Sequence, residues 1–497
     1  MEDTDTIITN RNEGTASSNT VTINAGNDKV EVTLEDVNIK SDSGSALTSS
    51  GDVTLTLKGD NSLTGGISGN GISSSGSLTI SGGEKDSLTA KGGSGLSGIF
   101  SSGGVTISGG TVNATGGSGA DGSGGSGIRT FSSGGVTISG GTVNANGGDG
   151  GGGDYSGGGS GIYSGSGDVT ISDGTVNAAG GDSGNGNYST GGNGIYNGGR
   201  SGSITISGGT VTAKGGSGED GEDGGDGIRS FDPVAISGGT VTAKGGSGED
   251  GSGGRGIIST KSVTISGGTV NANGGSGQNG NGGSGIIGSG RVAVSGGTVN
   301  AAGGDGGNGK DGGDGIYSSD IDLSGSLELT AKAGSPNGKA LSQRGNELDL
   351  NTIKDKLGPG AKVTVTDANG KVNQVSIPRP VEPEEPSSSS DGGSAAPSAP
   401  VSSLPGLTVT DKSGAVISYT STQSGNTLTV CVGRLTASLH VSLAALRQLR
   451  AEGIETIAFQ TILCSTTLSV DELLAMGGED AEAVLTHRFT DSSLTVG

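Results

Sequence analysis

Residues 105–117 read VTISGGTVNATGG, and near-copies of this stretch recur along the chain. Measured between equivalent first residues, from Val105 to Val292, the period is 29 to 35 residues. The variant SDGTV begins at Ser172, and the motif SGGTV begins at Ser108, Ser139, Ser207, Ser237, Ser266 and Ser295. A fixed period of this length predicts stacked repeats, in which each unit buries its apolar face against its neighbours.

Apolar and polar residues alternate within each unit over three short runs, 105–107, 111–114 and 127–129. Alternation with period two predicts strands, and three short strands per turn predict an all-β parallel β-helix. The side chains expected to point inward are those of Val105, Ile107, Val112, Ala114, Ile128 and their equivalents. The isoleucine after each loop then forms an inner ladder of Ile72, Ile99, Ile128, Ile162, Ile195, Ile228, Ile257, Ile286 and Ile316.

The chain divides into four regions by composition. Residues 1–335 are expected to form the β-helix, in about nine to ten coils. Residues 336–377 lose the period and are expected to cap the stack, with a hairpin around Asn369-Gly370. Residues 378–405 hold seven of the ten prolines and are expected to form a linker. Residues 406–497 are poor in glycine and predict a small α+β module.

The first convincing helix of the chain lies in this module and starts after Ser442. Leu443, Leu446 and Leu449 fall on one helical face, Ser442 is a candidate N-cap and Gly453 a stop signal. Strand-like runs flank the helix at 427–432, 454–461 and 493–496.

The Gly-rich loops between strands carry a second period. Glycine falls at every third residue in several of them, as at Gly119, Gly122 and Gly125. Three residues per turn is the period of a polyproline-II helix, and glycine at every third position permits close packing of such helices. Two interpretations stay open: mobile glycine loops, or loops stacked as a polyglycine-type layer beside the β-helix.

The chain carries a formal net charge of −22. An acidic balance disfavours nucleic acid and anionic membranes as partners, because both recruit Lys and Arg surfaces. No apolar run is long enough for membrane insertion. The start, MEDTDT, lacks the basic and apolar regions of a signal peptide. Either the chain is a fragment or mature form of a secreted or cell-surface protein, which we favour, or it is cytoplasmic.

Acidic residues crowd some of the loops. Ca²⁺ binds six to eight oxygen ligands, and carboxylates on glycine loops can supply them. The candidate metal ligands are Asp220, Asp223 and Asp226. The alternative is that these acidic loops are solvated and only keep the chain soluble.

The position after each ladder isoleucine should point outward and form an exposed ladder. It holds aromatic rings and guanidinium groups, which suit the stacking of sugar rings. The candidate carbohydrate-binding residues are Phe100, Arg129, Tyr163, Tyr196, Arg229 and Tyr317. The alternative is that neighbouring rings merely stack on one another.

Catalysis is not expected. A stack of near-equal coils offers no unique constellation, and both histidines, His440 and His487, lie in the C-terminal module. The Asp- and His-bearing motifs expected of β-helix polysaccharide hydrolases, such as GHG, do not occur.

The VTISGGTVNAxGG…SGI units, which cover roughly residues 50–333, resemble repeat-rich surface proteins of anaerobic gut Firmicutes. They are also similar to β-helical carbohydrate-binding domains of such bacteria. The resemblance implies a secreted, right-handed parallel β-helix that binds polysaccharide without cleaving it, together with Ca²⁺. No individual binding residue is carried over from it.

The leading hypothesis is a secreted or cell-surface protein that binds a polysaccharide, either a host or a plant glycan. The first alternative is a purely structural stalk or adhesin spacer, which presents the C-terminal module to a cell-surface neighbour. A second alternative is a β-helix polysaccharide lyase or glycoside hydrolase, and a third is ice binding through the flat Thr-x-Asn ladder.

Overall fold

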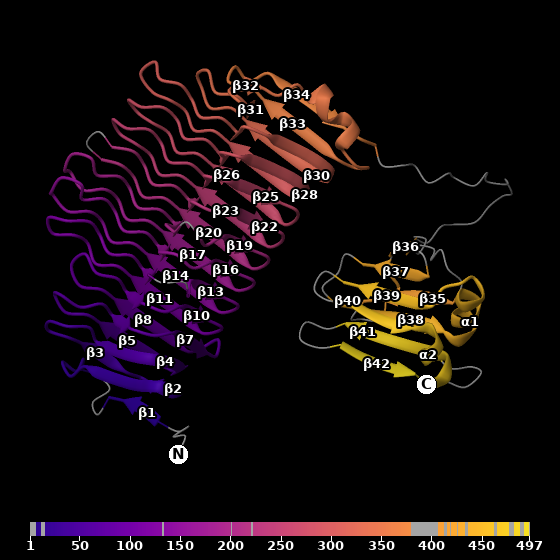
Figure 1. Cartoon of the computed structure of the whole chain (residues 1–497), viewed down its shortest axis with the longest axis horizontal. Coiled ribbons are helices and arrows are strands. Elements are labelled where there is room, and N and C mark those ends of the chain that lie inside the picture. Colours follow the sequence, from indigo (N-terminus) through magenta and orange to yellow (C-terminus); the bar gives the residue numbers. More distant parts are fainter. Residues whose placement is uncertain are drawn as a thin grey trace, which may run out of the picture. The chain divides into compact units, whose positions relative to one another are not determined.

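The computed structural model divides the chain into two compact units, residues 1–382 and 383–497 (Figure 1). The expected linker lies outside the described residues, except for Pro378. The structure describes residues 6–10, 15–131, 134–199, 201–219, 222–378, 406–411, 415–417, 419–424, 426–432, 436–461, 465–476, 482–487 and 492–496. Each unit is a fold of its own and is considered separately.

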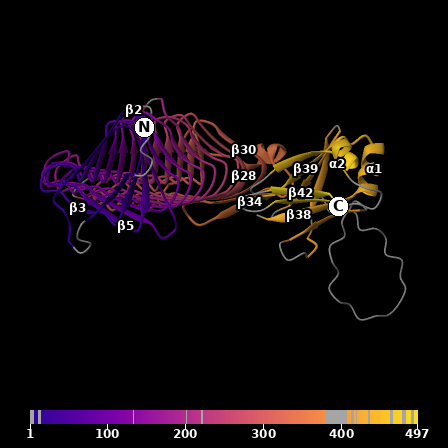
Figure 2. The same cartoon turned by 90° about the horizontal axis from the view of Figure 1, so that it is seen from below.

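The first unit is a parallel β-solenoid, which confirms the predicted fold. One coil holds three strands, for example β10 (Val105–Ile107), β11 (Thr111–Thr115) and β12 (Ile128–Thr130). Each strand pairs in parallel and in register with the equivalent strands of the coils before and after it. The coils follow one another as thin layers (Figure 2). Stacking creates three sheets, named faces A, B and C after β10, β11 and β12.

The strands of face A besides β10 are β1 (Thr6–Thr9), β7 (Leu78–Gly82), β13 (Val136–Ile138), β16 (Val169–Ile171), β19 (Ile204–Ile206), β22 (Val234–Ile236) and β25 (Ser262–Ile265). Those of face B besides β11 are β3 (Asn38–Lys40), β5 (Asp60–Thr64), β8 (Ser87–Lys91), β14 (Thr142–Asn146), β17 (Thr175–Ala179), β20 (Thr210–Lys214), β23 (Thr240–Lys244), β26 (Thr269–Asn273) and β33 (Lys362–Thr366). Those of face C besides β12 are β6 (Ile72–Ser74), β9 (Ile99–Ser101), β15 (Ile162–Ser164), β18 (Ile195–Asn197), β21 (Ile228–Ser230), β24 (Ile257–Ser259), β27 (Ile286–Gly288), β29 (Ile316–Ser318) and β31 (Leu341–Gln343).

Four long strands run across two faces. At the N-terminal end, β2 (Val21–Glu35) and β4 (Leu47–Lys58) pass from face C to face A. At the other end, β28 (Arg291–Ala302) and β30 (Ile321–Lys332) pass from face A to face B.

The solenoid has more coils than the nine to ten expected. Parallel pairing along face C joins twelve strands in one column: β2, β4, β6, β9, β12, β15, β18, β21, β24, β27, β29 and β31. The expected number was too low because the first and last coils lack the SGGTV motif but keep the inward apolar positions.

The inward assignment of the apolar residues is confirmed. Val105, Ile107, Val112, Ala114 and Ile128 are each at most 1% exposed. The whole isoleucine ladder from Ile72 to Ile316 is fully buried. One continuous core therefore runs the length of the solenoid, and each coil adds the same apolar layers to it.

The turn between faces A and B explains the variant SDGTV. The second glycine of the motif has a positive φ, 75° at Gly110 and 88° at Gly174, whereas the first does not. Left-handed backbone favours glycine at the second position. Asp173 stands at the first position, and its carboxylate accepts a hydrogen bond from the Gly174 amide at 2.7 Å.

The glycine-rich loops are stacked and joined by hydrogen bonds (Figure 1). The Gly125 amide donates to the Gly117 carbonyl of its own loop, and the Gly148 amide of the next loop donates to the Gly125 carbonyl, both at 2.8 Å. This alternation continues to Gly334. The members of this glycine zigzag are Gly117, Gly125, Gly148, Gly159, Gly181, Gly192, Gly216, Gly225, Gly246, Gly254, Gly275, Gly283, Gly304, Gly313 and Gly334.

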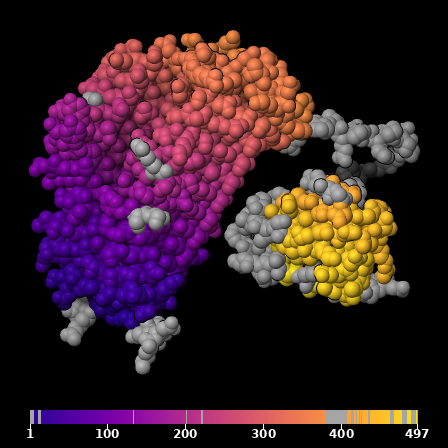
Figure 3. Space-filling view, viewed as in Figure 1, coloured from indigo at the N-terminus to yellow at the C-terminus, as the bar shows by residue number. Residues whose placement is uncertain are grey.

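No side chain fits at these positions. A Cβ built on any member of the zigzag would lie 1.7–2.3 Å from a carbonyl oxygen of the preceding coil. The α-hydrogens that take this place point toward those oxygens, as in a Cα–H···O contact. Of the two interpretations of the loops, the stacked layer is the one observed, and the coils pack into one continuous surface (Figure 3).

The C-terminal end of the solenoid contains the expected hairpin. β33 pairs with β34 (Val372–Ser376) in antiparallel fashion and with β30 in parallel, so the hairpin continues face B. β32 (Asn346–Glu347) and the 3₁₀ helix η1 (Leu350–Lys356) lie between β31 and β33. The Glu347 carboxylate accepts the Ala340 and Leu341 amides at 3.1 and 2.9 Å.

The described residues of the second unit form two four-stranded sheets and two helices. The Ser442 hydroxyl caps α1 (Leu443–Ala451) by accepting the Ala445 amide at 3.2 Å, as predicted. One sheet contains β35 (Leu407–Thr410), β38 (Ala437–Ser442), β41 (Glu482–His487) and β42 (Ser492–Val496). The other contains β36 (Thr420–Ser424), β37 (Thr427–Cys431), β39 (Thr456–Gln460) and β40 (Ser465–Ser469), and α2 spans Val470–Met476.

A matched pair of substitutions in one loop tests the glycine zigzag. In Gly159→Ala the new methyl group would lie 1.9 Å from the Gly125 carbonyl oxygen, whereas at Gly152 it would meet nothing within 4 Å. We expect Gly159→Ala to lower the free energy of unfolding by about 1–3 kcal/mol, as overpacking does. Gly152→Ala should be neutral or slightly stabilising. Chemical denaturation of both variants checks this, and equal midpoints would contradict a close-packed loop layer.

The second unit should lose stability in mild acid because of His487. This imidazole is fully buried, and burial lowers its pKa below the ordinary 6.5. The unfolded chain then takes up the proton first, so the free energy of unfolding should fall as the pH drops below about 6.5. Pulse proteolysis of this unit in urea at pH 7.5 and 5.5 measures the loss. In the variant His487→Gln the free energy of unfolding should change less between the two pH values. An equal change in both proteins would contradict the assignment of the acid sensitivity to His487.

Candidate functional site

The residue after each ladder isoleucine points out of face C, as predicted. Each strand of this face from β6 to β29 has buried first and last residues and a more exposed middle residue. Register pairing aligns these middle residues into one column. From the N-terminal end it reads Ser73, Phe100, Arg129, Tyr163, Tyr196, Arg229, Ile258, Ile287 and Tyr317.

Five consecutive members of this column join two further phenylalanines in a continuous set of ring contacts. The Arg129 guanidinium lies 4.5 Å from the Phe131 ring centre and 5.1 Å from that of Tyr163. The Tyr163 and Tyr196 rings meet edge to face at 5.3 Å, with 72° between their planes. We name this set the aromatic–arginine strip: Phe100, Arg129, Phe131, Tyr163, Tyr196, Arg229 and Phe231.

Phe131 and Phe231 were not predicted from the sequence. Each lies three residues after a ladder isoleucine, just beyond the end of its strand. Phe131 packs edge to face on Phe100 at 5.7 Å and is 50% exposed, and Phe231 contacts Tyr196 at 6.3 Å. Both lie at the same position of the repeat, but outside the strands, where no alternation of apolar and polar residues indicates the direction of a side chain.

Tyr317 stands apart from the strip. It occupies the same column and is 38% exposed, but the Ile258 and Ile287 rungs separate it from Arg229. Tyr317 therefore lacks the neighbouring rings that hold Tyr163 and Tyr196 in place.

The two arginines of the strip differ in their electrostatic surroundings. Arg229 pairs with the buried Asp226 at 2.9 Å. Arg129 forms no ion pair with any described residue, and its Nε is buried without a hydrogen-bond partner. Burial raises the pKa of the Tyr196 phenol above its ordinary value, so this hydroxyl stays neutral and able to donate. Arg129 is thus the arginine of the strip that has no acidic partner among the described residues.

The candidate calcium ligands have protein partners where they are described. Asp226 contacts Arg229 and, at 3.8 Å, Arg255, while Asp223 accepts the Ser252 amide at 2.7 Å. Asp220 lies outside the described residues. Among the residues that the structure describes, no three acidic, His or Cys side chains gather as a metal site would require. Calcium binding stays a prediction, and it would require Asp226 to leave its arginines.

Several loop carboxylates share one structural role. Each accepts a hydrogen bond from a backbone amide of the next coil, at 2.7–3.0 Å. These inter-coil carboxylates are Asp149, Asp182, Asp223, Asp226, Asp305 and Asp314. The carboxylates of loops that resemble cation sites in the sequence therefore also serve as hydrogen-bond acceptors for backbone amides of the next coil.

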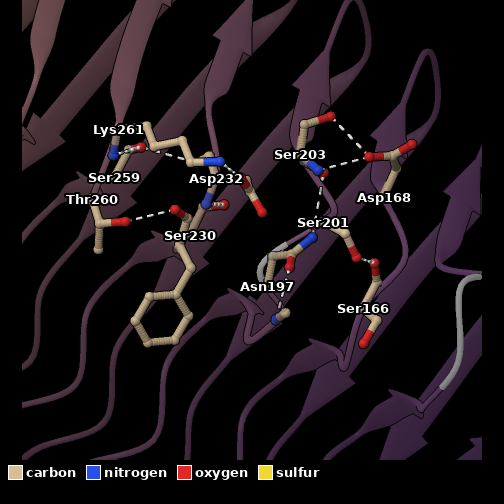
Figure 4. Close-up of polar contacts among 12 residues, drawn as sticks. Ser166, Asp168, Asn197, Ser201, Ser203, Ser230, Asp232, Ser259, Thr260 and Lys261 are labelled. Carbon is tan, nitrogen blue, oxygen red and sulfur yellow. Dashed lines mark hydrogen bonds and ion pairs between the residues drawn. The ribbon is translucent and has the colours of Figure 1, made fainter.

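A polar cluster lies at the corner between faces C and A (Figure 4). The buried side-chain amide of Asn197 donates to the Gly167 carbonyl at 2.9 Å. The Asp168 carboxylate accepts a hydrogen bond from the backbone amide of Ser203 at 2.6 Å. Lys261 forms an ion pair with Asp232 of the preceding coil. Several of the drawn contacts join successive coils and others lie within one coil, so the cluster holds the corner together.

The outward asparagine side chains of face B form hydrogen bonds with one another from coil to coil. The side-chain amide of Asn144 donates to the side-chain oxygen of Asn113 at 2.8 Å, and that of Asn177 donates to the side-chain oxygen of Asn144 at 2.9 Å.

Two cavities, of about 400 and 440 Å³, lie at the two ends of the solenoid, near Ile8 and Glu347, away from the strip.

No protein-family model matches the chain, and neither the curated proteins nor the solved structures contain a match. In the described part of the chain, no helix has the length and apolar character to cross a membrane.

Asp226 should contribute to stability through its ion pairs with Arg229 and Arg255. It also accepts a hydrogen bond from the backbone amide of Arg255 at 2.7 Å. Asp226→Asn keeps one acceptor oxygen but removes the charge. We expect a loss of about 2 kcal/mol in the free energy of unfolding, the scale of hydrogen bonds to charged groups. Thermal melts of both proteins, with calcium and with chelator, measure it. If calcium raises the melting temperature of the wild type alone, Asp226 is a metal ligand as well.

Proposed function

We propose that the solenoid binds polysaccharide, without cleaving it, along the aromatic–arginine strip, and that the protein acts outside the cell, secreted or at the cell surface. The observation that carries the proposal is the continuity of the strip across five coils. From Phe100 to Arg229 it covers four strand steps, or about 19 Å at about 4.8 Å per step. This length accommodates several consecutive sugar units of an extended chain.

The chemistry of the strip suits sugars. Aromatic rings offer apolar faces to the C–H groups of a sugar ring, and the phenols and guanidinium donate to hydroxyl oxygens. Contacts between neighbouring rings restrict their rotamers before any ligand arrives. Little side-chain entropy then remains to be lost on binding, which favours affinity.

The charge of the chain favours neutral glycans. At −22 overall, the protein repels a polyanion at long range. Arg129 is the strip's exception, because no described acidic side chain neutralises it. Acidic glycans held through Ca²⁺ at Asp220, Asp223 and Asp226 stay a second mode of binding, which a chelator should abolish without affecting the neutral mode.

A structural stalk is the second candidate function. The glycine zigzag, the inter-coil carboxylates and the asparagine ladder all stiffen the solenoid along its axis. A stiff rod would hold the C-terminal unit away from a surface, where it could contact a cell-surface neighbour. Such a rod has no need of the strip, and this difference separates the two candidates.

Tyr196→Ala should weaken binding to a neutral polysaccharide, because it removes the ring that contacts Tyr163, Arg229 and Phe231. We expect a loss of about ten-fold in affinity, or about 1.4 kcal/mol. Affinity electrophoresis of the full chain in gels containing neutral polysaccharides measures it.

Tyr317→Ala is the matched control, since it removes the same side chain from the same column outside the strip. The affinity of this variant for the neutral polysaccharide should equal that of the wild type. Equal losses in both variants would contradict a site localised in the strip, and no binding of any glycan by the wild type would favour the stalk.

A further inference from the structure

A second pair of tyrosines lies outside the strip, at the tips of two neighbouring loops. Tyr155 and Tyr188 stack on each other with ring centres 5.2 Å apart and 18° between their planes. They are 71% and 66% exposed, so they contribute almost nothing to the core. Neither was among the residues predicted from the sequence, because their loops have no strand periodicity.

These two loops are longer than their neighbours. Residues 147–161 and 180–194 connect faces B and C with fifteen residues each. The loop before them, 116–127, has twelve residues, and the loop after them, 215–227, has thirteen. The extra residues lengthen the two loops that carry the exposed tyrosines.

The backbone at the tips is strained. Tyr155 and Tyr188 have φ values of 62° and 61°, a left-handed conformation that bulky residues rarely adopt. Hydrogen bonds between loops hold it: the Tyr155 amide donates to the Asn187 carbonyl at 2.8 Å, and the Tyr188 amide to the Glu222 carboxylate at 2.5 Å. Strain retained at an exposed position is typical of functional sites.

The groups beside the rings identify the ligand class. Asp154 accepts both the backbone and the side-chain amide of Asn187, and Glu222 lies at the next coil. Carboxylate and amide oxygens beside an exposed aromatic face are acceptors for the hydroxyls of a sugar stacked on that face. We infer that Tyr155 and Tyr188 form a second saccharide-binding subsite, which engages a neutral sugar unit of the same polysaccharide. This inference rests on the proposed function.

The two subsites belong to the same two coils. Tyr155 and Tyr163 lie in one coil and Tyr188 and Tyr196 in the next. Eight residues separate the members of each pair, a reach of at most about 28 Å at about 3.5 Å per residue. One polysaccharide chain, or two branches of it, can therefore engage the strip and the tips together, and linking the two contacts raises the apparent affinity above that of either contact alone.

The double variant Tyr155→Gly/Tyr188→Gly separates binding from stability. Glycine accepts the left-handed backbone, so the melting temperature of the full chain should stay the same or rise. Affinity for galactomannan or xyloglucan in gel electrophoresis should fall by about ten-fold, as expected when one of two linked contacts is lost. Tyr155→Phe/Tyr188→Phe keeps both rings and should retain most of the affinity.

The possible outcomes are distinct. Unchanged glycan affinity in the double glycine variant, while Tyr196→Ala weakens binding, overturns the second subsite and leaves the strip. Wild-type protein that binds neither polysaccharide overturns the proposed function and this inference with it. Binding of polylysine that the glycine variant loses, with glycan affinity intact, would show that the tips recognise cationic peptides instead of sugars.

Discussion

Hydrogen bonding between the glycines of successive loops sets the distance between coils, and every outward surface depends on that distance. The zigzag from Gly117 to Gly334 leaves no room for a Cβ, so the loops approach one another as closely as the strands do. Strands and loops can then share one rise per coil over the whole solenoid. This explains many of the 110 glycines of the chain, because they are positions where backbone meets backbone.

The same constraint gives the acidic residues a role besides solubility. Loop amides that the zigzag does not use need acceptors, since an unpaired buried amide is costly. Asp182, Asp226 and Asp314 supply carboxylate oxygens to amides one coil away. Much of the negative charge in the loops is therefore coupled to stacking, and a carboxylate bound in this way is less available to a cation than its sequence suggests.

The fold could be predicted because the buried apolar positions recur in the sequence with the period of the coils. Ile128 and its equivalents alternate with polar residues, and Gly110 must recur where φ is positive. Hydrogen-bond partners within the loops could not be predicted, because glycine has no side chain to indicate which way it faces. The site was predicted in part: the column of Tyr163 and Tyr196 follows from the period, whereas Phe131 and Tyr155 lie outside the strands, where no alternation indicates direction.

Departures from the repeat show where a repeated scaffold can carry a specific function. The inner ladder of face C is isoleucine from Ile72 to Ile316, while the adjacent outward column changes from serine to aromatic, arginine and isoleucine. Core packing does not require this variation, because the outward residues add no buried layer. The ring contacts of the strip and the two longest of these glycine loops occur in the same coils. A purely structural rod would be served equally well by identical coils, so the coincidence of both departures favours a surface selected for recognition.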